Sequence, residues 1–340
     1  MVVWLGFAAL ILFLLALDLG VFHRKAHIVS PREGLVWSIV WATLSFGFAV
    51  FIFHAYDQQW FGLGTVPDPV DRSPDNPLGT LNDGWSAVVK YLTGYVVEQS
   101  LSIDNMFVIA MLFRFFAVPA AFQHRVLFWG ILGALTLRGA MIAVGATLVS
   151  QFAWILYLFG IFLIITAAKM LFTDVEDSDP RNNIVVRLTR RLFPVTKRFY
   201  GQRFVVRRGG RLLLTPLALA LVMVETTDVI FAVDSIPAIF AITADPFLVF
   251  ASNAFAILGL RSLYFVLAGA LLTFRYLKVS LALVLGMVGT KMLLHDWLKE
   301  LVGEYFNLYV LAAILLILGT GTLASLLLPV PAERPAAEEL

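Results

Sequence analysis

The chain contains no cysteine and few charged residues. Because none of its 340 residues is Cys, disulfides, thiolate metal ligands and thiol redox chemistry are excluded within this chain. Asp, Glu, Lys and Arg together make up only 14% of the residues, whereas hydrophobic residues make up 60%. This composition is typical of a protein that crosses a lipid bilayer several times, and not of a soluble enzyme.

Common motifs of catalysis and nucleotide binding are missing as well. The sequence has no GxxxxGK[ST] phosphate loop, no HExxH zinc motif and no nucleophile elbow. The five histidines fall near the ends of apolar runs and do not converge in the sequence. We therefore predict that the protein is not an enzyme, holds no redox cofactor and has no nucleic-acid partner.

Apolar runs of about 20 residues, enough to cross about 30 Å of hydrocarbon, recur along the chain. We expect nine transmembrane helices, at 2–22, 34–54, 85–112, 123–149, 151–172, 213–242, 247–269, 271–294 and 305–328. The first run follows no basic segment and precedes no small-residue cleavage site, so we interpret it as a retained helix. The predicted fold class is an all-α polytopic membrane protein.

Loop charges alternate along the chain and predict its orientation. The loop at 173–212 holds ten Lys or Arg against four acids, whereas the loop at 55–84 holds five acids and one Arg. Every odd-numbered loop is basic and every even-numbered loop is not, which places the N-terminus outside and the C-terminus in the cytoplasm. We expect the basic loop to lie on anionic lipid, and the loop at 55–84 to be an irregular external segment.

Five acidic side chains lie inside predicted membrane spans. Glu98 and Asp104 fall in the third span, and Glu225, Asp228 and Asp234 in the sixth. Each carboxylate at mid-bilayer costs about 2.5–3.5 kcal/mol on the insertion scale. Such residues face a polar interior, so they mark a candidate functional site.

An ordered series of residues predicts an internal repeat. The series is Glu98, Asp104, Arg138 and Lys169 in the first copy, and Asp228, Asp234, Arg261 and Lys291 in the second. Each copy holds three helices, so the second copy enters the membrane from the opposite side, as in the inverted repeats of secondary transporters. The expected units are 1–84 with two helices and the external loop, 85–172 (first repeat), 173–212 (basic loop), 213–294 (second repeat) and 295–340 with the last helix and tail.

Clustered carboxylates with amide and hydroxyl oxygens suit a hard divalent cation such as Mn²⁺, Mg²⁺ or Ca²⁺. The candidate ligands are Glu98, Asp104, Asn105, Glu225, Asp228 and Asp234, and the candidate supporting residues are Asp18, Arg138, Arg261, Lys169 and Lys291. We expect both arginines to pair with acids, and both lysines to extend toward the membrane surface from helix ends. Asp18 could instead form an interfacial pair with the nearby Arg24 or Lys25. A purely structural polar network and a proton-only relay remain as alternatives.

The six-residue spacing of the acids makes a further prediction. Six residues turn an ideal helix by about 240° net, so Glu98 and Asp104 do not share a face. The acids of each pair therefore make different contacts on opposite faces, or each helix is interrupted so that its acids converge. Pro237, three residues after Asp234, favours an interruption of the sixth helix.

Five segments resemble the TerC family of integral membrane proteins, in its Alx-like branch. They are residues 16–27 (ALDLGVFHRKAH), 97–108 (VEQSLSIDNMFV), 224–238 (VETTDVIFAVDSIPA), 252–265 (SNAFAILGLRSLYF) and 289–295 (GTKMLLH). The resemblance implies manganese export and an alkaline-pH response. The family name refers to tellurite resistance, and an older label refers to redox modulation. Carboxylates would repel the tellurite oxyanion and the chain has no Cys, so both of those roles would be indirect.

The resemblance names Mn²⁺, whereas the residues alone reach only a hard divalent cation. We therefore expect a transporter of the bacterial inner membrane that exports Mn²⁺ as its substrate by alternating access, with protons as an open choice of coupling ion. A membrane scaffold or stress-response protein without transport activity is an alternative, and so is a passive channel. The loop at 55–84 departs from the compact form of the family.

Overall fold

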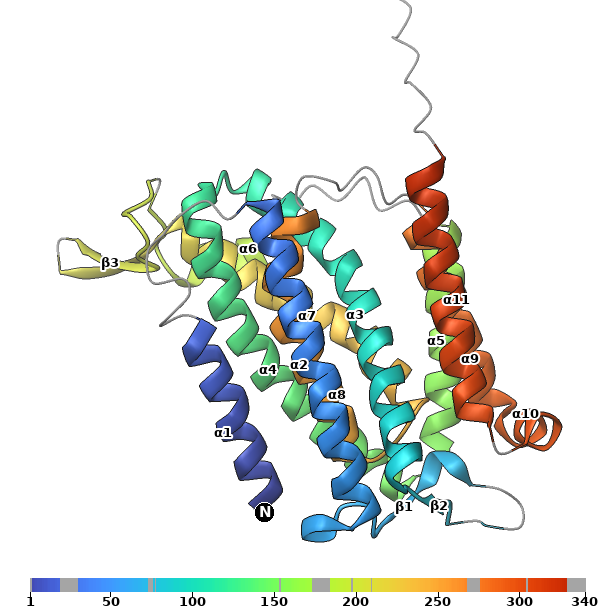
Figure 1. Cartoon of the computed structure of the whole chain (residues 1–340). Helices are drawn as coiled ribbons and strands as arrows, with labels where there is room; N and C mark the ends of the chain where they lie inside the picture. Colours follow the sequence, from blue (N-terminus) through green and yellow to red (C-terminus); the bar gives the residue numbers. More distant parts are fainter. Residues whose placement is uncertain are drawn as a thin grey trace, which may run out of the picture.

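The computed structural model describes residues 2–18, 30–72, 76, 78–152, 154–172, 184–196, 198–208, 210–267, 276–303 and 305–328. Within these ranges, nine apolar helices form a bundle (Figure 1). They are α1 (Val2–Leu17), α2 (Pro31–Asp57), α3 (Gly84–Phe115), α4 (Ala120–Gln151), α5 (Trp154–Phe172), α7 (Pro216–Phe240), α8 (Pro246–Leu267), α9 (Leu277–Leu293) and α11 (Phe306–Leu327). Each falls on one of the nine predicted spans, and the all-α polytopic fold is confirmed.

Seven helices of the described part are long and apolar enough to cross a membrane. The other two, α1 and α9, hold 16 and 17 described residues. At about 1.5 Å per residue they reach about 25 Å, slightly less than the hydrocarbon thickness of about 30 Å.

Several short elements join the helices and were not expected from the sequence. They are α6 (Ile184–Leu192), α10 (His295–Val302), β1 (Pro67–Asp68) paired antiparallel with β2 (Thr80–Leu81), β3 (Val205–Arg208) paired antiparallel with β4 (Arg211–Leu214), and the 3-10 turns Trp60–Gly62 and Pro69–Asp71. In Figure 1, β1, β2 and α10 lie at the end of the bundle where the chain begins, and β3 lies at the opposite end. The acidic and basic loops are thus on opposite sides, as the charge pattern predicts.

Side-chain caps define where the helices of the site begin. The carboxylate of Asp83 accepts a hydrogen bond from the Ser86 amide at 2.7 Å and starts α3. The hydroxyl of Thr215 caps α7 in the same way, and Pro216 occupies the first helical position. Asp245 accepts from the Phe247 amide at 2.9 Å where α8 begins.

The packing of the six repeat helices is reciprocal. Helix α3 of the first repeat packs against α8, and its counterpart α7 packs against α4, the counterpart of α8. In the same way, α3 contacts α9 and α7 contacts α5. In Figure 1, α3 starts beside β2, whereas α7 follows β4 at the other end of the bundle. A pseudo-twofold axis between inverted repeats predicts this arrangement. The boundaries of the units stay a prediction.

Helices α5 and α9 approach closely at two glycines. A Cβ atom on Gly289 would lie 2.8 Å from the carbonyl oxygen of Gly160, and one on Gly160 would lie 3.1 Å from the carbonyl oxygen of Gly289. Small residues of this kind let membrane helices pack backbone to backbone.

The predicted interruption of the sixth helix is wrong. Helix α7 is continuous from Pro216 to Phe240, with Pro237 in its last turn. Pro237 has a helical φ but offers no N–H to the carbonyl group of residue 233, and the helix continues for three residues beyond it. The other interpretation holds, because Asp228 and Asp234 contact different helices of the bundle.

Candidate functional site

Acids from the two repeats meet at Arg138, in the middle of α4. The Arg138 guanidinium binds both oxygens of Asp228 on α7, with Nε at 3.1 Å and Nη2 at 2.8 Å. Its Nη1 atom donates to Oε1 of Glu98 on α3. Bidentate charge-assisted hydrogen bonds of this type fix both distance and orientation. The prediction that Arg138 pairs with acids is confirmed.

This centre is buried. Arg138 is 1% exposed, Glu98 0% and Asp228 9%. Charges removed from solvent persist only when they are paired and hydrogen-bonded. Neutral groups add weaker contacts, since Nη1 lies 3.3 Å from Oγ of Ser235 and 3.4 Å from Oδ1 of Asn253.

Carboxyl groups outnumber the guanidinium at this centre. Glu98 and Asp228 both face Arg138, so the three side chains would carry a net charge of −1 with both acids ionised. Oε2 of Glu98 is buried and accepts no hydrogen bond in the described part of the chain. An unsatisfied carboxylate oxygen in such a place needs a proton or a cation.

The other acids of α7 lie apart from this pair. Glu225 is half-buried, and its carboxylate lies against Gly133 of α4, where a Cβ atom would come within 2.0 Å of Oε1. Asp234 accepts a hydrogen bond from Oγ1 of Thr166 on α5 at 3.2 Å. Asp228 and Asp234 therefore serve different helices, and the exposed Lys169 of α5 is near Asp234.

The remaining predicted ligands lie on α3. Asn105 is 5% exposed and belongs to the buried face of that helix. The side chain of Asp104 lies outside the described part. Among the described residues, no group of three or more His, Asp or Glu side chains is placed to hold a metal ion. The structure thus brings Glu98 and Asp228 together, and it does not gather the six predicted ligands into one set.

Asp18 pairs with an arginine of another helix, and its alternative partners Arg24 and Lys25 lie outside the described residues. It is 4% exposed and binds Nη2 of Arg261, whose Nη1 lies 3.3 Å from Nε2 of His124. The prediction that Arg261 pairs with an acid is confirmed. Because the Arg261 contact joins α1 to α8, Asp18 is part of the interior of the bundle.

The prediction that Lys291 extends to the membrane surface is wrong. Lys291 is 3% exposed, and its Nζ atom donates to the carbonyl oxygen of Ala241 at 3.0 Å and to Oδ1 of Asn307 at 3.3 Å. Ala241 is the C-cap of α7, where unpaired carbonyl groups and the helix dipole attract a cation. Lys291, which lies on α9, therefore caps the C-terminal end of α7.

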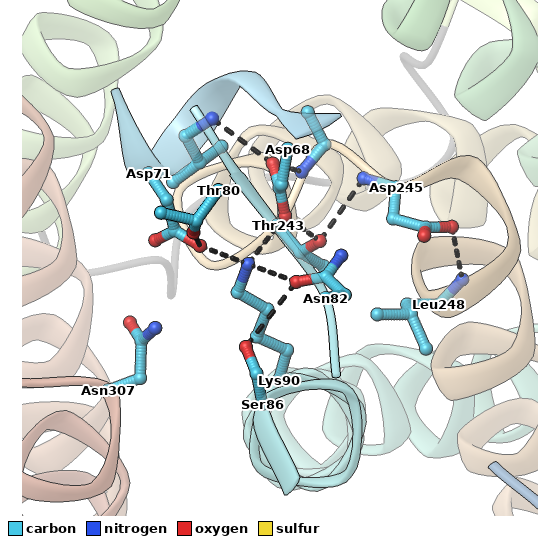
Figure 2. Close-up of polar contacts among 12 residues, drawn as sticks. Asp68, Asp71, Thr80, Asn82, Ser86, Lys90, Thr243, Asp245, Leu248 and Asn307 are labelled. Carbon is cyan, nitrogen blue, oxygen red and sulfur yellow. Dashed lines mark hydrogen bonds and ion pairs between the residues drawn. The ribbon is translucent and has the colours of Figure 1, made fainter. Parts of the chain in front are cut away.

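A second buried polar cluster lies at the end of the bundle that carries β1 and β2, which the loop charges predict to be the outer end (Figure 2). The sequence reasoning missed this cluster. Its centre is Lys90 of α3, which is 0% exposed. The Nζ atom of Lys90 lies 2.8 Å from Oδ2 of Asp68 and 2.6 Å from Oδ1 of Asn82, and it also binds Asp71. The sequence feature that could have revealed this cluster is Lys90 itself, a single lysine in an apolar run that follows the acidic loop at 55–84.

Asp68 also joins this cluster to the second repeat. It accepts hydrogen bonds from Oγ1 of Thr243 and from the Ala244 amide, the latter at 3.0 Å. Burial raises the pKa of Asp68, but the ion pair with Lys90 and these hydrogen bonds outweigh it and hold the pKa below its usual value. Burial raises the pKa of Asp245, in spite of the hydrogen bond from Tyr56.

Comparisons with known proteins identify relatives over most of the chain. Residues 83–331 match the model described as "Integral membrane protein TerC family". An "Uncharacterized membrane protein STKORF319" of Myxococcus xanthus is 46% identical over 296 residues, which cover 87% of this chain and 84% of that protein. The protein named "Putative membrane-bound redox modulator Alx" in Escherichia coli K12 is 45% identical over 295 residues, 86% of each chain. No solved structure matches.

Proposed function

We propose that this chain, which belongs to the TerC family of integral membrane proteins, exports a divalent metal cation, Mn²⁺, across the bacterial inner membrane. One observation carries the proposal. Glu98 of α3 and Asp228 of α7, one from each repeat, converge on one guanidinium in a buried centre within the membrane-spanning helices. Intramembrane carboxylates at a repeat interface are the usual site of a transported cation.

The chemistry of the centre favours a hard cation. Its acceptors are carboxylate, amide and hydroxyl oxygens, and the chain has no thiolate to offer a softer metal. Glu98, with the unpartnered oxygen Oε2, is the first ligand that we assign, and Asp228 the second. The proposed pathway continues along α3 and α7 through the other candidate ligands, which are Asp104, Asn105, Glu225 and Asp234. Asp234 lies on the side of α7 that faces α5.

The reciprocal packing of the two repeats supports alternating access as the mechanism that we propose. If the helices α3–α5 rock against α7–α9, the carboxylate pair opens first to one side and then to the other. The excess negative charge would be neutralised by the cation in one state and by a proton in the other, which makes protons the coupling ion that we propose.

Flux through reconstituted vesicles tests this function. Vesicles that contain a Mn²⁺-sensitive dye should report saturable flux with the wild-type chain, and a pH gradient should alter it. We expect E98Q, D228N, D104N and D234N each to reduce the flux about tenfold or more. D57N removes an exposed acid at the end of α2 and should leave the flux unchanged. Absence of flux, together with a stable partner protein on co-purification, would instead favour a scaffold.

A further inference from the structure

Arg138 occupies the carboxylates that the proposed function requires. Its guanidinium holds both oxygens of Asp228 and one oxygen of Glu98, which leaves only Oε2 of Glu98 without a partner among the described residues. A divalent cation that binds this pair must therefore replace the guanidinium. Both are positively charged, and in a buried site their repulsion prevents joint occupancy.

We propose that Arg138 is a resident cation of the transport site, which the transported cation displaces on binding and which returns when that cation leaves. This inference rests on the proposed function and adds a specific role for one residue. It makes Arg138 a positioning residue that competes with the substrate, because the same oxygen atoms serve both.

Neutral acceptors already surround the guanidinium in the position where it holds the carboxylates. Oγ of Ser235 and Oδ1 of Asn253 lie 3.3 and 3.4 Å from Nη1, on α7 and α8. These neutral acceptors let the side chain keep hydrogen bonds while it gives up the carboxylates. Arginine remains charged throughout the exchange, since its guanidinium does not lose its proton in proteins.

Charge balance explains why a resident cation is needed. A divalent cation would neutralise Glu98 and Asp228 completely, whereas Arg138 neutralises one of the two charges. Without either, two buried carboxylates would face each other across the repeat interface, which is strongly unfavourable. The return of Arg138 neutralises one of these charges and leaves the other for the coupling proton of the proposed function. The metal-free protein can then change the side that it faces, a step that net export requires.

Arg261, the corresponding residue of the second repeat, faces other groups. It binds Asp18, which follows α1, and its Nη1 atom lies 3.3 Å from Nε2 of His124 on α4. The two repeats therefore differ in the groups that face their arginines, and the assignment applies to Arg138 only.

The test separates net transport from exchange. The full chain and its R138Q variant are placed in vesicles, and Mn²⁺ efflux into metal-free buffer is compared with exchange of radioactive Mn²⁺ for unlabelled Mn²⁺. We expect R138Q to lose net efflux about tenfold or more while exchange persists, because the exchange cycle never passes through the empty site. The apparent affinity for Mn²⁺ should also become about tenfold tighter, since the competitor is gone.

Each other result counts against the inference. Unchanged net efflux in R138Q would overturn it, and so would loss of both activities in a protein that keeps its size-exclusion profile. If R138Q does not fold, R138K decides: a single ammonium group holds the pair less well than the bidentate guanidinium. Mn²⁺ should then bind R138K more tightly than the wild type, and equal or weaker binding would overturn the inference.

Two further comparisons distinguish failure of the inference about Arg138 from failure of the proposed function. R207Q removes one arginine charge from the exposed face of β3 and should behave like the wild type in both assays. A wild-type chain that shows neither efflux nor exchange would refute the proposed function itself. A wild type with both activities and an R138Q variant equal to it would refute the role of Arg138 alone.

Discussion

Nζ of Lys90 and Oδ2 of Asp68 lie 2.8 Å apart, and neither side chain is exposed to solvent. Lys90 belongs to the second turn of α3, whereas Asp68 ends the short strand β1 of the preceding loop. Ion pairs at protein surfaces contribute little, but a buried pair becomes costly as soon as one member is removed. This pair therefore holds the outer loop on the bundle.

We expect K90M to destabilise the protein by about 3–5 kcal/mol, because Asp68 and Asp71 lose their buried counter-charge. Thermal unfolding of the purified protein in detergent measures the loss. The double variant D68N/K90M should recover part of it, since the mutated pair is then neutral. A K90M variant that melts at the wild-type temperature would show that the cluster does not stabilise the fold.

Asp68 and Asp245 should respond to pH with opposite signs. The pKa of Asp68 is lowered by folding, so its stabilising contribution is complete above about pH 4 and is lost as the pH falls through the folded-state pKa. The pKa of Asp245 is raised by folding, so ionisation of Asp245 reduces stability as the pH rises above about 4.

Unfolding temperatures between acidic and neutral pH check this expectation. D68N should reduce stability at neutral pH and flatten the loss in acid. D245N should not reduce stability at neutral pH, because an Asn side chain can still cap α8 through its carbonyl oxygen. Equal losses in both variants at neutral pH would contradict the opposite signs.

The contact between α5 and α9 gives a matched pair of glycine substitutions. We expect G289A to destabilise the protein by about 1–3 kcal/mol, since its Cβ atom would lie 2.8 Å from the rigid backbone oxygen of Gly160. G286A, one turn earlier, places its Cβ atom 3.7 Å from the Ala167 side chain, an ordinary contact. Thermal unfolding should therefore separate the two variants, and similar behaviour would argue against the close crossing.

Gly133 positions the carboxylate of Glu225. A Cβ atom on residue 133 would overlap that carboxylate, which can move because it ends a flexible side chain. We expect G133A to leave stability nearly unchanged and to weaken Mn²⁺ flux as E225Q does. The double variant G133A/E225Q should be no worse than E225Q alone, because both changes act on one group. An additive loss in the flux assay would mean that the two residues act independently.

The long helices were predictable, whereas the partners of buried charges were only partly so. Nine apolar runs of membrane length fix the helices, because hydropathy depends on local composition. The pairing of Arg138 and Arg261 with acids followed from the need to neutralise buried charge. Which acid each arginine would choose did not follow, because Glu98, Asp228 and Asp18 come from three other helices.

The wrong predictions came from local rules that tertiary contacts override. Pro237 suggested a broken helix, but α7 continues through it and ends three residues later, at Phe240. Lys291 lies near a helix end and was expected to reach the membrane surface, but the end of α7 offers it the carbonyl oxygen of Ala241. Lys90 was overlooked because a single lysine at the start of a span usually contacts lipid headgroups.

The hydrogen bonds of Asp68 make the outer loop a brace between the two halves of the bundle. The same carboxylate touches Lys90 in the first half and Thr243 and Ala244 in the second. Any rocking of one half against the other must lengthen these hydrogen bonds or move the loop together with one half. The stiffness of this end of the bundle is therefore set by a loop that precedes residues 83–331, the segment that matches the family model. A change in this loop would alter the speed of any such motion and leave the carboxylate pair in place.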